Sequence, residues 1–108
     1  MPRVLIVDDQ KDVRDLLGAA LQDQGVESVA AADGGSALRE LCRATAEGNP
    51  FDVMLLDIVM PGLDGWRVMA AVKSNPLWED LPIIVITGQA TGADDIWRVT
   101  EFDGVYAE

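Results

Sequence analysis

Three short, continuous runs of apolar residues constrain the fold of this chain more than any other feature. They occupy residues 4–7, 53–56 and 83–86, and β-branched Val and Ile dominate two of them. Runs that are apolar at every position are typical of strands covered on both faces, as in a parallel sheet. Longer stretches with apolar residues at helical spacing separate these runs. The sequence therefore predicts repeated βαβ units.

The stretches between the runs predict four helices. The first ends before Gly25 and carries apolar residues at intervals of three and four, namely Val13, Leu16, Leu17, Ala20 and Leu21. The second carries Ala37, Leu38, Leu41 and Cys42, and we expect Cys42 to be buried on this face. Asp64 can cap a third helix, and a fourth is expected from about residue 91 to 101.

Two weaker strands, at residues 27–31 and 104–107, complete the order β-α-β-α-β-α-β-α-β. The first of these is more polar, which favours an edge position. Right-handed crossovers then give one sheet with helices on both faces. Trp78, between the third helix and the next strand, is expected to be a loop residue folded onto the body. The 108 residues suit a single domain.

The composition excludes several classes of protein. A net charge of −11 repels phosphate backbones, so we expect no direct binding to nucleic acid. No apolar run is long enough to cross a bilayer, and no secretory signal opens the sequence, so a cytoplasmic location without a membrane is expected. One cysteine and no histidine exclude an internal disulfide and a zinc site of the usual kinds.

Polar residues follow three of the predicted strands. Asp8 and Asp9 follow the first apolar run, Asp57 follows the third strand, and Thr87 follows the fourth. In an open parallel sheet, ligands bind beyond the carboxyl ends of the strands, where the strand order reverses. Converging carboxylates repel one another, and a set of oxygen ligands alone suits a hard cation such as Mg²⁺. A lone Asp at a strand end is usually a helix cap, but the conjunction of these four residues favours a site.

The same residues could carry phosphoryl chemistry. Asp57 could attack phosphorus and become an aspartyl-phosphate, with Mg²⁺ bridging a phosphoryl oxygen and the acidic pair. The hydroxyl of Thr87 could donate a hydrogen bond to the new phosphoryl group, and Gly88 leaves room for close approach of the backbone.

Nearly the whole chain resembles the receiver domain of two-component response regulators. The matching segments are VLIVDDQKDVRDLL, DVMLLDIVMPGLDGW and PIIVITGQA. The resemblance implies a flavodoxin-like, doubly wound, five-stranded parallel sheet of order 2-1-3-4-5. It also implies phosphorylation of Asp57 by a histidine kinase or a histidine phosphotransfer protein, and such a domain only assists its own phosphorylation and dephosphorylation.

The resemblance also assigns the remaining roles. Mg²⁺ would be held by Asp8, mostly through water, by Asp9 and Asp57, and by the backbone carbonyl of Val59. Thr87 and Tyr106 would form the switch that responds to the phosphoryl group. Gly88 and Gln89 would flank that group.

Two features of the family pattern are not matched. The Lys that follows the fifth strand would come after Glu108, and the fifth helix is absent, so residues 1–108 read as a receiver domain truncated before that helix. Its loss would expose apolar surface, which a homodimer or a swapped element could cover. The lysines present, Lys11 and Lys73, read as surface residues of helices.

Three other functions compete with this one. A pseudo-receiver, acting as a phosphorylation-independent interaction module, would explain the unmatched Lys. A haloacid-dehalogenase-like phosphatase would need a second Asp two residues after the nucleophile, where Val59 stands. The third alternative is flavin binding by the same fold, and an acidic pocket disfavours it because it would repel the phosphate of the flavin.

Overall fold

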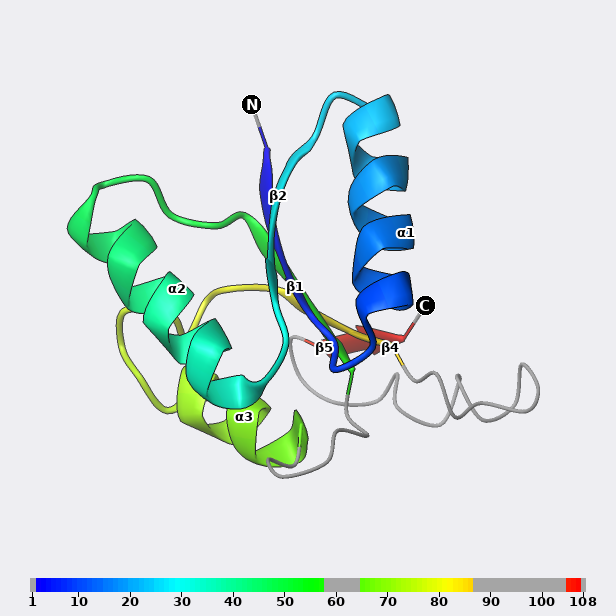
Figure 1. Cartoon of the computed structure of the whole chain (residues 1–108). Coiled ribbons are helices and arrows are strands. Elements are labelled where there is room, and N and C mark those ends of the chain that lie inside the picture. Colours follow the sequence, from blue (N-terminus) through cyan, green and yellow to red (C-terminus); the bar gives the residue numbers. More distant parts are fainter. Residues whose placement is uncertain (1, 58–64, 87–104, 108) are drawn as a thin grey trace.

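The computed structural model describes residues 2–57, 65–86 and 105–107. Five parallel strands form one sheet of order β2-β1-β3-β4-β5, which confirms the predicted architecture (Figure 1). The elements are, in chain order, β1 (Arg3–Val7), α1 (Lys11–Asp23), β2 (Glu27–Ala31), α2 (Gly34–Ala46), β3 (Val53–Asp57), α3 (Gly65–Lys73), β4 (Ile83–Ile86) and β5 (Val105–Ala107). The helix expected at residues 91–101 and the cap expected at Asp64 lie outside the described residues.

The helices cover the two faces of the sheet unequally. In Figure 1, α1 lies on one side of the sheet, and α2 and α3 lie on the other. The strand side chains that face α2 and α3 are almost completely buried, and in register across the sheet they are Leu5, Val7, Met54, Leu56, Ile83 and Val85. Each contributes about 1.5–3 kcal/mol by leaving water. This side of the sheet therefore holds the main core.

On the α1 side the central strands are less well covered. Ile6 is buried, but its neighbours in register, Leu55 and Ile84, are only half-buried. The alternation along β3 and β4 follows from the strand period of two, which sends successive side chains to opposite faces. Half of the apolar content of β3 and β4 thus remains partly open to solvent.

Local signals fix the ends of the helices. The backbone N–H of Ser36 donates to Asp33 Oδ1 at 2.7 Å, which caps α2. Gly25, at φ 75°, adopts the left-handed conformation just after α1, as the sequence predicts for a helix stop.

Among the described helices, none has the length and hydropathy needed to span a bilayer.

One expectation about the helical faces is wrong. Cys42 is exposed, because the buried face of α2 runs through Gly34, Ala37, Leu41 and Ala44. Leu16 is 69% exposed, and no residue of α1 is fully buried. Trp78 is half-buried and packs against the core, which confirms its expected place.

Candidate metal centre

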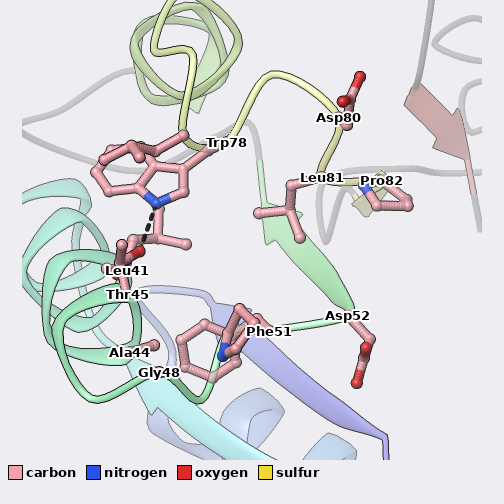
Figure 2. A pocket seen from close by; sticks show the side chains of 12 residues that line it. Leu41, Ala44, Thr45, Gly48, Phe51, Asp52, Trp78, Asp80, Leu81 and Pro82 are labelled. Atoms are coloured by element: carbon pink, nitrogen blue, oxygen red, sulfur yellow. Dashed lines mark hydrogen bonds between the residues drawn. The ribbon is translucent and has the colours of Figure 1, made fainter.

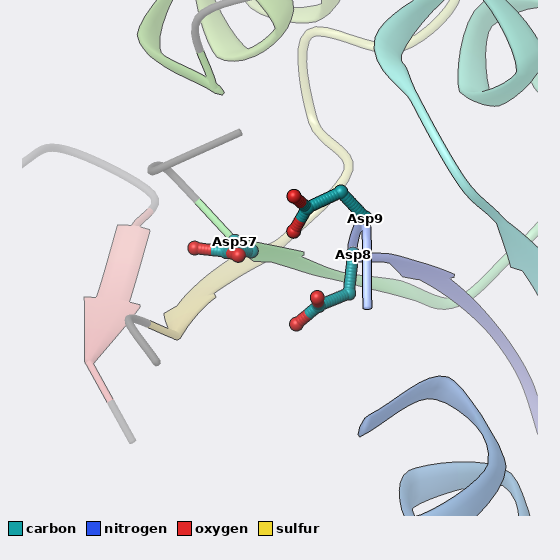
Figure 3. A group of neighbouring side chains, drawn as sticks. All are labelled: Asp8, Asp9 and Asp57. Atoms are coloured by element: carbon teal, nitrogen blue, oxygen red, sulfur yellow. The ribbon is translucent and has the colours of Figure 1, made fainter. Parts of the chain in front are cut away.

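Three carboxylates meet at the carboxyl ends of β1 and β3. Val7 pairs with Leu56 in the sheet, so the residues that follow them, Asp8 and Asp57, lie side by side at this edge. Figure 3 shows the side chains of Asp8, Asp9 and Asp57 gathered there. One carboxylate oxygen of each lies within 4.8 Å of the others. The structure therefore brings together the three acids that the sequence predicts to converge.

Hydrogen bonds hold Asp8 firmly in this position. Its backbone N–H donates to the carbonyl of Ala31 at 3.1 Å, which extends the pairing of β1 with β2 by one residue. Its Oδ1 accepts the N–H of Gln10 at 2.9 Å, just before α1 begins. Arg14 Nη1 donates to the carbonyl oxygen of Asp8 at 2.9 Å. The link from β1 into α1 is thus fixed through both the backbone and the carboxylate of Asp8.

Within this cluster, the Asp8 carboxyl is costly to ionise. Asp8 and Asp57 are each only 4% exposed. Burial raises the pKa of the Asp8 carboxyl, and the charge of Asp9 raises it further, whereas the Gln10 N–H and the Arg14 guanidinium lower it. A bound cation would relieve this strain by compensating the clustered negative charge.

The donor atoms fit a hard divalent ion. Within the described part of the chain, the one buried side-chain oxygen with no hydrogen-bond partner is Asp9 Oδ1. A buried carboxylate oxygen without a partner is unfavourable unless a ligand completes it. Oxygens on opposite sides of Mg²⁺ are about 4.2 Å apart, so acids separated by up to 4.8 Å can share one such ion directly or through its waters.

Other residues expected at the site are not all described. Val59, Thr87, Gly88 and Gln89 lie outside the described residues. Tyr106 lies in β5, paired with Ile84, and its expected role in the switch stays a prediction.

Sequence reasoning missed Arg14 and judged Lys11 correctly. Lys11 pairs with Asp15 at 2.7 Å on the exposed surface of α1, so it is a helix-surface residue as predicted. Arg14 is half-buried and contacts the acidic cluster through the backbone of Asp8. Its signal in the sequence is weak, because Asp8 precedes α1 and the spacing of six residues does not by itself predict a contact with Arg14.

A doubly wound parallel sheet with clustered acids where the strand order reverses is typical of the proteins that have their ligand site at the carboxyl ends of the strands. The sequence profile of the response regulator receiver domain matches residues 4–105. This chain therefore belongs to the response regulator receiver domain family, whose members are generally not classical enzymes.

The chain is similar to several characterised proteins. It is 33% identical to the protein PilH of Pseudomonas aeruginosa, over 90% of this chain and 76% of PilH. It is 30% identical to the transcriptional regulatory protein TcrA of Mycobacterium tuberculosis, over 94% of this chain but 36% of TcrA. The chain thus spans little more than a third of the length of that regulator.

Solved structures agree with this assignment. The response regulator protein TrrA of Thermotoga maritima, solved in complex with Mg²⁺ and BeF, is 30% identical. The match has a TM-score of 0.74 and covers 99% of this chain and 85% of that one. TrrA has also been solved in complex with the histidine kinase ThkA. The matching chain of that complex is 32% identical to this chain with a TM-score of 0.71, and the match covers 86% of this chain and 74% of the matching chain.

Proposed function

We propose that this chain accepts a phosphoryl group on Asp57 from a phosphohistidine of a sensor histidine kinase or a histidine phosphotransfer protein. The observation that carries the proposal is the group of three carboxylates within 4.8 Å, in which Asp9 Oδ1 is buried and has no hydrogen-bond partner among the described residues. The complex of TrrA with a histidine kinase supports this kind of donor. An Asp57 oxygen forms the new bond to phosphorus, the phosphorus–nitrogen bond of the phosphohistidine breaks, and its electron pair returns to the imidazole.

Asp8, Asp9 and Asp57, together with the carbonyl of Val59, are proposed to hold Mg²⁺. The ion would supply charge neutralisation, which lowers the barrier to bringing an anionic phosphoryl group up to a carboxylate. The residues of this chain do the positioning. Gln10 and Arg14 fix Asp8, and β3 fixes Asp57 at the strand end, where it is 4% exposed.

The proposed response to phosphorylation uses residues beyond the cluster. The hydroxyl of Thr87 moves toward the phosphoryl group and donates a hydrogen bond to one of its oxygens. The ring of Tyr106 then moves inward. Gly88 and Gln89 flank the phosphoryl group. A local change of charge would thereby bias a two-state element of the fold.

The proposal extends to the organisation of the protein. Residues 1–108 act as a receiver domain in the cytoplasm. A fifth helix or a second copy of the chain covers the α1 side of the sheet, and the half-buried Leu55 and Ile84 support such a cover. The activity is limited to Mg²⁺-dependent phosphorylation and dephosphorylation of its own Asp57.

Phosphorylation is tested with acetyl phosphate and Mg²⁺, followed by mass spectrometry of the intact protein. We expect a gain of one phosphate in the wild type, no gain in Asp57→Asn, and no gain when EDTA replaces Mg²⁺. Asp23→Asn, at an exposed position at the end of α1, is the matched control and should be phosphorylated normally. Absence of any gain, also in a version extended beyond Glu108, would contradict the proposal and favour a pseudo-receiver.

A further inference from the structure

A cavity lies near the amino ends of the strands, whereas the acidic cluster lies at their carboxyl ends. It has a volume of about 510 Å³ and lies between the C-terminal half of α2, the segment before β3 and the segment that joins α3 to β4 (Figure 2). Phe51 and Pro82 line it just before the amino ends of β3 and β4. With about 3.3 Å per strand residue, Asp57 lies roughly 16 Å along the chain direction of β3 from Asp52, which also lines the cavity. This cavity is therefore separate from the proposed phosphoacceptor site.

The walls of the cavity are apolar and aromatic. Figure 2 shows Leu41, Phe51, Trp78 and Leu81 around the hollow. Most ligand sites are concave and apolar, with a few polar groups that provide specificity. Leu77 lies at the margin with 68% of its surface exposed, so the apolar surface continues outward beyond the cavity. An occupant that covers both the hollow and Leu77 would bury more apolar area than a small molecule held inside.

Hydrogen bonds hold the walls in place. Trp78 Nε1 donates to Thr45 Oγ1 at 3.0 Å, and Thr45 Oγ1 donates to the carbonyl of Leu41 at 2.9 Å. Lys73 Nζ donates to the carbonyl of Leu81 at 2.7 Å. The Arg3 guanidinium lies 4.6 Å from the centre of the Phe51 ring. Binding to such a preformed surface costs little ordering of side chains.

The charge at the margin is negative. Asp52 and Asp80 line the cavity, and both are exposed. Arg3 and Lys73 contact the wall residues Phe51 and Leu81 but do not line the cavity, so none of the described lining residues carries a positive charge. Asp52 Oδ2 accepts the backbone N–H of Arg3 at 2.7 Å. The net charge of −11 adds to the negative potential around this margin. Apolar walls with carboxylates at the margin complement a group that is apolar at its centre and cationic at its edge.

We propose that this cavity is a docking site for a basic segment of a partner protein, in which Arg or Lys flanks an apolar side chain. The apolar side chain enters between Phe51, Trp78 and Leu81. The cationic side chain reaches Asp52 or Asp80 at the margin. Arg beside an apolar or aromatic anchor is the combination that dominates binding at many protein interfaces. The site does not depend on phosphorylation of Asp57.

The test is a titration of the ¹⁵N-labelled protein with the peptide acetyl-Gly-Arg-Leu-Arg-Gly-amide, followed by NMR in the presence of Mg²⁺. We expect saturable shifts of the Trp78 indole N–H and of the Thr45 and Leu81 amides. Two control peptides, with Glu in place of Arg or with Gly in place of Leu, should bind at least about fivefold more weakly. Higher salt should also weaken the binding of the first peptide.

Matched variants separate this site from general attraction to an acidic protein. The double variant Asp52→Asn with Asp80→Asn should weaken binding by about fivefold or more, and Leu77→Ser should weaken it as well. Asp23→Asn and Leu16→Ser make the same exchanges at exposed positions of α1 and should leave binding unchanged. Well-dispersed spectra confirm that each variant is folded. Shifts that spare Trp78, or equal binding of all three peptides, would overturn the proposal.

Discussion

Replacement of Asp9 by Asn is expected to stabilise the metal-free protein, although it removes a proposed metal ligand. Asp9 contributes a carboxylate oxygen within 4.8 Å of those of Asp8 and Asp57. Two charges at that distance repel by about 3.5 kcal/mol at an effective dielectric of about 20, and by about 0.9 kcal/mol in water. Because Asp9 is only half-buried, the lower value is closer, and two such pairs give roughly 2 kcal/mol. The buried Asp9 Oδ1 accepts no hydrogen bond from the described residues, so no such bond at this atom opposes the gain.

The assay is urea unfolding at pH 7.5, with EDTA and with millimolar Mg²⁺ at matched ionic strength. In EDTA, Asp9→Asn should exceed the wild type by roughly 2 kcal/mol in the free energy of unfolding, whereas Asp80→Asn, an exposed control, should differ by less than about 0.5 kcal/mol. With Mg²⁺ the wild type should gain about 2.7 kcal/mol at 100 times its Kd, and the variant much less. A gap that Mg²⁺ leaves unchanged, or a variant less stable in EDTA, would refute the electrostatic reasoning.

Three further outcomes follow from the same structure. The stability of the metal-free protein should fall as pH rises from the ordinary carboxyl pKa to the raised pKa of Asp8, because the folded state holds that proton longer; the fall should be smaller in Asp8→Asn when urea unfolding is compared across this range. Arg14→Met should raise the pKa of Asp8 further, measured by NMR titration of its carboxyl carbon, whereas Arg39→Met on α2 should not. Leu56→Ala should cost about 2–5 kcal/mol of unfolding free energy in chemical denaturation, because Leu56 is completely buried, and Leu16→Ala should cost far less.

The strands could be predicted from the sequence because their signal is local. Runs such as residues 83–86 are apolar at every position, and the prediction that they form strands is confirmed. Their order in the sheet, which only the resemblance to the family implies, is confirmed as well. The helical faces were predicted less well. Periodicity places Leu41 correctly, but Cys42, only one residue further along α2, turns away from the sheet into solvent. Which edge of an apolar stripe is buried depends on what lies opposite, and that is a tertiary property.

Convergence of the acids was predictable because parallel strands bring their carboxyl ends to the same edge of the sheet. The contact between Arg14 and the carbonyl of Asp8 was not, since it depends on the angle at which α1 leaves the sheet. The cavity was equally hidden. Its walls come from residues 41–52 and 77–82, and only the path of α3 and the following segment brings Trp78 against Thr45.

The two ends of β3 show how position, and not residue type, decides what an acid can do. Asp52 directly precedes β3 and Asp57 is its last residue, and both are ordinary aspartates in the sequence. Asp52, just before the amino end of β3, is exposed and accepts a hydrogen bond from the backbone N–H of Arg3, so both water and this N–H stabilise its carboxylate. Asp57, at the carboxyl end, is 4% exposed and lies within 4.8 Å of two further carboxylates, so a charge added or removed there is screened by water and salt far less than one at the exposed Asp52.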